Sequence, residues 1–419
     1  MRTARYPCFL MLGAALVLLA TLPSAAQNRS RFPLPDLSIP GALGVNPHFI
    51  APPPGELERI RKAGFRWIRT DITWSEIERK RGEYDFSGYD RMLAGLRATG
   101  VRAILVLDYT NDLYMHAAPA TDEERAAFTR WAVATVTRYR NRGVLWEMWN
   151  EPNGSFWAPR ANAEEYAKLA LEVGKAIRRA APDEWYVGPA TSGMDVDFLR
   201  KCFDAGLLEY WDAVTVHPYR NSDPESATGE IRAIERLIAA KAPPGKRIPL
   251  IDGEWGYSTL YPGINADLQA AYLAREALVG LMNDVGLTIW YDWRDDGTDP
   301  KNSEHHFGVL LPNGDPKPPY YELRALAGAL DGYRFTMRMD LGTAGDYCLR
   351  FARGGSKRLA VWTRASAHTV TIPFAKGSFD VLDATGVRTR AESGPNGLEI
   401  ALTGHVKYLI PRRGGAGLR

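Results

Sequence analysis

Residues 146–153, Trp-Glu-Met-Trp-Asn-Glu-Pro-Asn, end in a carboxylate, Glu151, beside an amide, Asn150. The preceding residues 142–145, Arg-Gly-Val-Leu, supply a turn and an apolar lead-in, so residues 145–151 are expected to form a short buried strand. Pro152 cannot donate a hydrogen bond to a neighbouring strand, so pairing should stop at Glu151. Glu151 is therefore expected where a strand opens into a loop, with its side chain facing a cleft.

A second carboxylate stands in the same kind of position downstream. Residues 249–256 read Pro-Leu-Ile-Asp-Gly-Glu-Trp-Gly, and Glu254 follows the apolar run. The two glutamates are far apart in the sequence, so only a fold that returns several times to one rim brings them together. Most glycoside hydrolases use a pair of carboxylic acids that flank the bond to be cleaved, and two glutamates on one rim can form such a pair.

Residues 41–328 alternate short apolar strands with amphipathic helical stretches, which is typical of a parallel α/β protein. Eight such units predict a (β/α)8 TIM barrel rather than an open doubly wound sheet. No glycine-rich loop follows the first strand, so the sequence lacks the phosphate-binding loop that a dinucleotide-binding fold requires. Strands are expected at 43–46, 65–71, 102–108, 145–151, 185–190, 213–217, 249–254 and 287–291, and helices at 55–63, 89–99, 121–139, 163–180 and 267–283.

The pattern changes after residue 328. Short alternating runs separated by Gly, Asn, Asp and Ser predict a small antiparallel β-sandwich over residues 331–412. This stretch holds no comparable cluster of polar site residues. We therefore expect an accessory domain that packs on the barrel without reaching the catalytic rim. The runs are 347–351, 358–363, 368–373, 379–382 and 398–402.

Residues 1–26 have the pattern of a secretory signal peptide: two arginines, an apolar run at 9–20, and Ser24-Ala25-Ala26 before the expected cleavage site. The apolar run is too short to span a bilayer, although a retained anchor helix is the alternative. A periplasmic or secreted protein without a stable membrane anchor is expected. The formal net charge of +3 gives no indication of a nucleic-acid partner. Export permits a disulfide between Cys202 and Cys348, but two separate buried thiols are equally compatible with their spacing.

Polar residues gather at the expected carboxyl ends of the strands, where barrel enzymes build their active sites. One polar strand end is unremarkable, whereas a set around one rim indicates a site. The set comprises Asn46, His48, Arg69, Asp71, Asp108, Tyr109, His217, Tyr219 and residues 290–293.

Residues 146–153 and 251–255 resemble retaining glycoside hydrolases of clan A, most closely glycoside hydrolase family 39 and related bacterial exopolysaccharide hydrolases. Residues 65–86 and 307–318 resemble the second barrel unit of that family and the exit from its eighth strand. The resemblance implies Glu151 as the acid/base, Glu254 as the nucleophile, and no cofactor.

The remaining site residues have expected roles that follow from their chemistry. Asn150 can bond a sugar 2-hydroxyl, a contact that strengthens in the transition state. His217 and Tyr219 are candidates to hold Glu254 or a sugar hydroxyl, and the fixed charge of Arg69 favours the ionised form of Glu254. Substrate-binding roles are also expected for His48, at the first strand end, and for Trp290, whose ring offers a flat face to a pyranose.

Two further acids and one histidine pair receive structural interpretations. Glu147 and Asp252 share strand parity with the two glutamates, so we expect both to point into the barrel and to pair there. His305 and His306 have no third ligand at suitable spacing, so a solvated loop is favoured over a metal site.

Three alternatives remain open. A catalytically silent sugar-binding barrel would keep the aromatic residues but usually lose one glutamate, and a metal-dependent barrel hydrolase would need a ligand set such as His-x-His. The third alternative is an exo-acting β-glycosidase such as a β-xylosidase. We favour action inside a β-linked polysaccharide, with the producer's own exopolysaccharide as a candidate substrate, because many aromatic residues stand on the expected loops. These are Tyr109, Tyr114, Trp157, Trp255, Tyr257, Tyr261 and Trp293.

Overall fold

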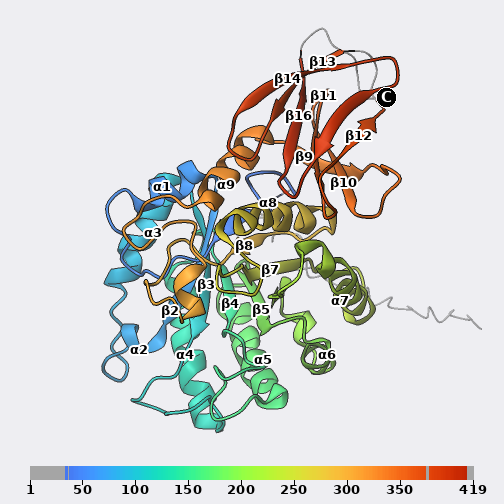
Figure 1. The fold of residues 1–419 in the computed structure, drawn as a ribbon. Coiled ribbons are helices and arrows are strands. Elements are labelled where there is room, and N and C mark those ends of the chain that lie inside the picture. Colours follow the sequence, from blue (N-terminus) through green and yellow to red (C-terminus); the bar gives the residue numbers. More distant parts are fainter. Residues whose placement is uncertain (1–33, 36, 374–376, 413–419) are drawn as a thin grey trace, which may run out of the picture.

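A computed structural model describes residues 34–35, 37–373 and 377–412 (Figure 1). The expected signal peptide, residues 1–26, lies outside the described residues. Within the described part of the chain, no helix combines the length and the apolar character needed to cross a membrane.

The first part of the chain forms a closed barrel of eight parallel strands in sequence order, β1 to β8, with β8 pairing back to β1. The prediction of a TIM barrel is confirmed. Its strands are β1 (Leu43–Val45), β2 (Trp67–Thr73), β3 (Arg102–Asp108), β4 (Leu145–Met148), β5 (Trp185–Ser192), β6 (Ala213–His217), β7 (Leu250–Trp255) and β8 (Thr288–Trp290). Its helices are α1 (Glu56–Ala63), α2 (Trp74–Ile77), α3 (Ser87–Thr99), α4 (Asp122–Arg138), α5 (Ala163–Ala180), α6 (Val196–Asp204), α7 (Thr228–Lys241), α8 (Ala266–Met282) and α9 (Pro318–Ala329), with short 3₁₀ turns η2 (Leu207–Glu209), η3 (Pro224–Ala227) and η4 (Ser303–His306).

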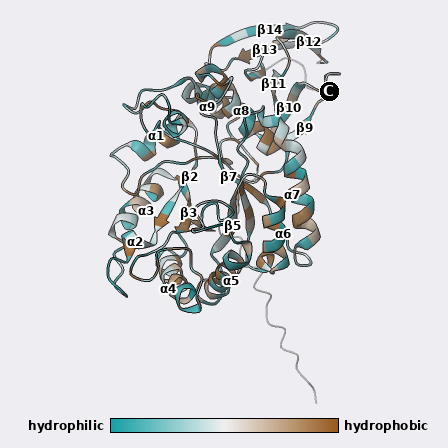
Figure 2. Ribbon diagram, turned by 60° about the horizontal axis from the view of Figure 1, so that its bottom comes forward, coloured by the Kyte–Doolittle hydropathy of each residue, from teal (hydrophilic) through white to brown (hydrophobic). Residues whose placement is uncertain are grey.

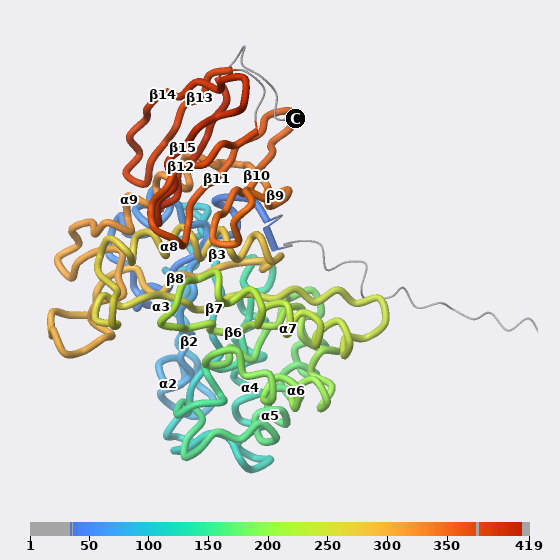
Figure 3. The backbone as a smooth tube through the Cα atoms, turned by 45° about the vertical axis from the view of Figure 1, so that its right-hand side comes forward, coloured from blue at the N-terminus to red at the C-terminus, as the bar shows by residue number. Residues whose placement is uncertain are grey.

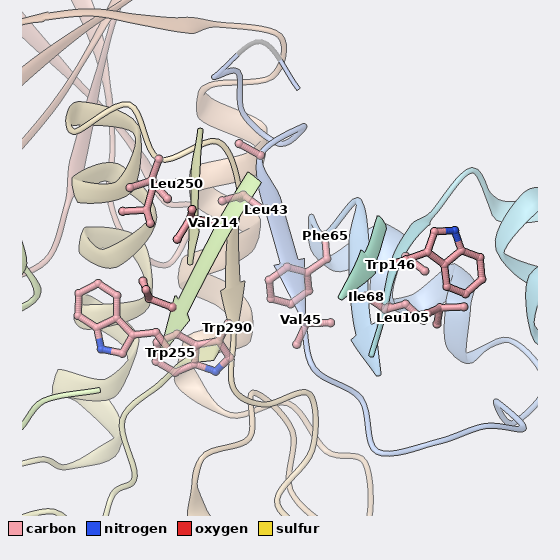
Figure 4. Close-up of a cluster of buried hydrophobic side chains, with 14 of the residues drawn as sticks. Leu43, Val45, Phe65, Ile68, Leu105, Trp146, Val214, Leu250, Trp255 and Trp290 are labelled. Carbon is pink, nitrogen blue, oxygen red and sulfur yellow. The ribbon is translucent and has the colours of Figure 1, made fainter. Parts of the chain in front are cut away.

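The strands are apolar on both faces because both faces are covered. The side chains that fill the barrel interior form a cluster of their own, which includes Trp67, Ile104, Leu145 and Ile251. The outward faces pack against the helices in the main core, where Leu105, Trp146 and Leu250 are buried (Figure 4). Figure 2 shows the complementary pattern on the surrounding helices, which carry both hydrophobic and hydrophilic residues. This double burial explains the near-continuous apolar strands.

The fourth strand ends earlier than the sequence predicts. Strand β4 stops at Met148, whereas pairing was expected to continue to Glu151. Trp149 and Glu151 have φ values of 64° and 43°, in the left-handed region that side chains other than glycine rarely adopt. The chain therefore turns sharply after β4, and Asn150 and Glu151 lie in the loop rather than in the strand. Such backbone outliers concentrate at functional sites.

The C-terminal region forms two antiparallel sheets. One has six strands in the order β14-β13-β16-β11-β10-β9, and the other pairs β12 with β15. Leu359 and Phe379 of the larger sheet share a core with Ile372 and Leu398 of the smaller one, which makes the region a β-sandwich as predicted. The strands are β9 (Arg334–Arg338), β10 (Asp346–Arg353), β11 (Ser356–Thr363), β12 (His368–Ile372), β13 (Gly377–Leu382), β14 (Arg388–Ser393), β15 (Leu398–Leu402) and β16 (Lys407–Pro411).

The sandwich packs at one side of the barrel, beside α8 and α9 (Figures 1 and 3). A buried hydrogen bond of 2.6 Å runs from Trp362 Nε1 to Glu225 Oε1 on η3, and Arg275 of α8 forms a buried ion pair with the same glutamate. His405 bonds to Glu322 of α9 at 3.0 Å. These polar contacts fix the sandwich against the barrel wall. Cys202 and Cys348 are both free and buried, so the structure has two separate buried thiols and no disulfide between these two residues.

Candidate active site

A cavity of about 850 Å³ opens at the carboxyl ends of the barrel strands. Its walls come from the carboxyl ends of the eight barrel strands and the loops that follow them, and no residue of the C-terminal sandwich lines it among the described residues. The polar lining residues include Asn46, His48, Arg69, Asp71, Asn150, Glu151, Tyr219 and Glu254.

Arg69 is the centre of the site. It extends from β2 into the barrel, is 2% exposed, and uses all three guanidinium nitrogens. Nε donates to Glu147 Oε2 at 2.6 Å, Nη1 to Glu254 Oε2 at 2.7 Å, and Nη2 to Asn150 Oδ1 at 2.8 Å. One side chain from the second strand therefore joins residues of the fourth and seventh strand ends.

Glu254 receives three hydrogen bonds. Besides Arg69, Asn46 Nδ2 donates to Oε2 at 3.1 Å and the Tyr219 hydroxyl donates to Oε1 at 2.9 Å. Burial, together with the neighbouring carboxylate, raises the pKa of Tyr219 well above its ordinary value, so the hydroxyl stays protonated and acts as a donor. All three groups donate to Glu254, so its carboxylate is held in one orientation at the cavity.

Glu151 has different surroundings. Its side chain is 16% exposed, and Oε1 lies 2.9 Å from Nδ1 of the fully buried His217. Burial raises the pKa of Glu151, against a smaller opposing effect of Arg69 and a hydrogen bond with Ser192. Burial also lowers the pKa of His217 to about 4, so this imidazole is neutral near neutral pH and adds no positive charge beside Glu151. Glu151 therefore keeps its proton more readily than an exposed glutamate.

The two glutamates face each other across the cavity. A carboxylate oxygen of Glu151, a ring nitrogen of His217 and a carboxylate oxygen of Glu254 all lie within 4.8 Å of one another. This spacing is close to the separation of about 5–5.5 Å between the carboxyl groups of retaining glycosidases and shorter than the roughly 6.5–9.5 Å of inverting ones.

A pair of acids lies beside Arg69 at the ends of β2 and β3. Asp71 lines the cavity, and the fully buried Asp108 lies near it, with no hydrogen-bond partner for either carboxyl oxygen among the described residues. Burial, together with the neighbouring Asp71, raises the pKa of Asp108 well above its ordinary value.

Trp290 does not line the cavity. Its side chain is 2% exposed and lies beside Trp255 on the outer face of the barrel, between β8 and the covering elements (Figure 4). The next residue, Tyr291, lines the cavity instead, with its ring centroid 5.3 Å from that of His48 and 6.2 Å from that of Tyr219. A sugar platform at this strand end is therefore offered by Tyr291 rather than by Trp290.

The two additional acids behave differently from each other. Glu147 points into the barrel and pairs with Arg69, as expected. Asp252 does not: Ile251 occupies the barrel interior, and the Asp252 carboxyl group interacts with the buried Glu276 of α8 outside the barrel. A register irregularity between Asp252 and Trp255 breaks the strict alternation on which the parity argument relied.

Other expected site residues are distributed between the cavity and the core. His48 lines the cavity and bonds Asp296 at 3.1 Å. Of the aromatic loop residues, Tyr109 and Tyr261 line the cavity, Tyr114 stacks on Trp74, and the others are buried: Trp157, Trp255, Tyr257 and Trp293. Sequence reasoning missed the apolar lining residues Phe156 and Phe307, of which Phe156 is 47% exposed.

Two groups of side chains among the described residues have a geometry that suits a metal ion. One is Glu151, His217 and Glu254 in the site itself, and the other is His48, Asp292 and Asp296 at its edge. His305 and His306 belong to neither group. They contact the backbone of the Asp299 loop instead, which agrees with their interpretation as loop residues.

Comparison with known proteins places these observations in context. Residues 56–296 match the model of the family described as cellulase (glycosyl hydrolase family 5). A β-xylosidase from Geobacillus stearothermophilus is 25% identical over 316 residues, in a match that covers 62% of this chain and 61% of the relative. The chain thus spans about six tenths of the length of that relative.

Solved structures of several glycoside hydrolases share the fold. A family 39 glycoside hydrolase from Bacteroides cellulosilyticus WH2 superposes with a TM-score of 0.79 at 24% identity, covering 92% of this chain and 82% of that one. A GH39 β-xylosidase from Caulobacter crescentus has a TM-score of 0.66 at 18% identity over 90% and 96% of the two chains. A GH30 endoxylanase from Clostridium papyrosolvens C71 has a TM-score of 0.65 at 12% identity over 88% and 96%. The resemblance to clan A glycoside hydrolases is confirmed.

The hydroxyl of Tyr219 provides a direct test of the hydrogen-bond network around Glu254. Replacing Tyr219 by Phe removes one hydrogen bond to a charged acceptor, a contact of about 1.5–3 kcal/mol, so kcat/KM should fall by about 10- to 150-fold. Tyr261→Phe is the matched control, because Tyr261 lines the same cavity and its hydroxyl does not bond to Glu151 or Glu254. Steady-state kinetics on an aryl glycoside measure both variants, and equal losses would contradict the assigned role of Tyr219.

Proposed function

The chain belongs to the cellulase family (glycosyl hydrolase family 5), and from that premise we propose that it is a retaining β-glycosidase with Glu254 as nucleophile and Glu151 as acid/base. It is a glycoside hydrolase built on a TIM barrel. The observation that carries the proposal is the short separation of the two carboxylates, which lie within 4.8 Å of each other. A water molecule cannot be placed between a nucleophile and a sugar at the spacing of a retaining site, so one carboxylate must attack directly.

The different surroundings of the two glutamates support the division of roles. Glu254 accepts bonds from Arg69, Asn46 and Tyr219, which fix the orientation of its carboxylate. Glu151 is half-buried beside a neutral imidazole, and its raised pKa suits a group that must donate a proton to the departing oxygen. In the second step, Glu151 takes a proton from the attacking water, and the glycosyl bond to Glu254 breaks.

Asn150 supports the same chemistry from the neighbouring position. Its Oδ1 accepts a hydrogen bond from Arg69 Nη2 at 2.8 Å, which fixes the plane of the amide. The NH2 group of Asn150 takes no part in this bond. The NH2 group can then donate to the sugar 2-hydroxyl, an interaction that strengthens in the transition state. Arg69 therefore positions both the nucleophile and the residue proposed to hold the reacting sugar.

Azide rescue tests the two roles separately. Glu254→Ala should be nearly inactive on an activated β-glycoside and should regain turnover with azide, giving a glycosyl azide of inverted configuration. On a substrate with a good leaving group, Glu151→Ala should accumulate the glycosyl-enzyme. Azide should then react with this intermediate and give a product of retained configuration. Each product results from azide entering the space left by the removed carboxylate.

The control for this experiment is Glu304→Ala, because Glu304 lines the same cavity and contacts Tyr291 rather than the reacting pair. Its turnover should not depend on azide. If the two active-site variants gave azides of the opposite configurations, the roles of Glu151 and Glu254 would have to be exchanged. If neither variant responded while both stayed folded by circular dichroism, the double-displacement mechanism would be excluded.

We further propose a β-linked polysaccharide or oligosaccharide as substrate, cleaved at internal bonds, with an exopolysaccharide as a candidate. The cavity volume of about 850 Å³ is near the upper end of the common range for ligand sites, about 300–1,000 Å³, which favours more than one sugar unit. Aromatic rings on several walls, Tyr109, Phe156, Tyr261, Tyr291 and Phe307, offer stacking surfaces along its length. The alternative of an exo-acting β-xylosidase is favoured by the curated relative of that name.

Product sizing distinguishes these alternatives. An internal cleavage mode should release oligosaccharides of several lengths at the earliest times from a long β-linked glycan, and the viscosity should fall before much reducing sugar appears. Xylan and a bacterial exopolysaccharide should be compared on the same day with the same enzyme preparation. Release of monosaccharide alone at early times, above all from xylo-oligosaccharides, would favour the exo-acting alternative.

Export to the periplasm or the medium is proposed from the sequence of residues 1–26. The mature protein is then proposed to have no stable membrane anchor and no nucleic-acid partner.

A further inference from the structure

Three side chains from two loops converge at the edge of the cleft. His48 follows β1, whereas Asp292 and Asp296 follow β8, and one ring nitrogen and one oxygen from each carboxylate all lie within 4.8 Å of one another. His48 Nδ1 lies 3.1 Å from Asp296 Oδ1. The proposed mechanism uses none of these three groups.

Asp292 gives an independent indication of a ligand. The residue is 1% exposed, and its Oδ1 is buried with no hydrogen-bond partner among the described residues. Burying a carboxylate without a partner is costly, so such groups are normally paired or bound to a metal. The nearby cation, Lys317, donates to Asp295 at 2.7 Å, and the Gly308 amide donates to the same oxygen. The local cation is thus directed to Asp295 and not to Asp292.

We propose that His48, Asp292 and Asp296 bind one divalent transition cation of the Zn²⁺ or Mn²⁺ class. One imidazole nitrogen with two carboxylates suits these ions, whereas Ca²⁺ prefers six to eight oxygen ligands. Ligands with bonds of about 2.0–2.2 Å lie roughly 3.4 Å apart on a tetrahedral ion. The observed spacing, 3.1 Å for one pair and at most 4.8 Å for all, therefore needs only small side-chain movements.

The position of this site gives the ion a structural role in substrate binding. It would tie the loop after β1 to the loop after β8, which also meet through the backbone bond from Trp293 N to the Asn46 carbonyl at 3.0 Å. The His48 ring is 5.3 Å from the Tyr291 ring, and both line the cleft. Binding the ion therefore holds one wall of the sugar site in place, without taking part in bond cleavage.

Isothermal titration calorimetry of the chelator-treated full chain with MnCl2 and with ZnCl2 tests the proposal. We expect one ion per chain, and Asp292→Asn and Asp296→Asn should each weaken binding by at least about tenfold, since even loss of residues that only orient ligands costs 10- to 100-fold. Asp296 is partly exposed, so its variant remains informative if the buried Asp292 variant fails to fold. The Mn²⁺ electron paramagnetic resonance spectrum should report the loss of free ion in the same samples.

Asp112→Asn is the matched control. Asp112 contacts His116 Nδ1 at 3.0 Å in an exposed His–Asp pair that has no third ligand among the described residues, so the substitution should leave ion binding unchanged. The absence of binding to the wild-type chain would overturn the proposal, as would equal affinities of the wild type and both cluster variants. Binding that survives in Asp292→Asn but is lost in Glu254→Gln would place the ion at the Glu151–His217–Glu254 group and would equally overturn it.

Discussion

The buried guanidinium of Arg69 determines how the parts of this site fit together. A charge that is 2% exposed is tolerable only if it is fully paired, and Arg69 meets that condition with Glu147, Glu254 and Asn150. Because arginine holds its donors in one plane, it can join three strand ends at set angles, which a lysine cannot do. The barrel thus brings β2, β4 and β7 to one point, and the bond from Arg69 orients the carboxylate of Glu254, the proposed nucleophile.

The two glutamates, proposed as acid/base and nucleophile, have the same chemistry but different surroundings in the cavity. Glu254 is surrounded by donors, whereas Glu151 is half-buried beside His217, whose pKa burial lowers to about 4. At a pH above the pKa of His217 the imidazole is neutral, so it carries no positive charge that would lower the pKa of Glu151. Activity should then persist until the pH rises through the raised pKa of Glu151, where the acid loses its proton.

The fold and the proximity of Glu151 and Glu254 can be predicted from the sequence for a physical reason. Strand ends in a parallel barrel share one rim, so Glu151 and Glu254 could be placed together from their local patterns alone. The neighbours of a side chain are harder to predict. A sharp turn with left-handed backbone at Trp149 and Glu151 ended β4 early, and an irregularity in β7 turned Asp252 outward to Glu276. For the same reason Trp290 faces the core and Tyr291 the cavity: strand parity cannot be counted across an irregular strand end.

The stereochemistry of the first product distinguishes a double from a single displacement. Proton NMR of a β-glycoside during the first turnovers, before mutarotation, shows which anomer is released. We expect the β-anomer, because the attack by Glu254 and the later attack by water each invert the anomeric carbon. Release of the α-anomer by the wild-type protein would show a single displacement and would contradict the assignment of Glu254 as a nucleophile.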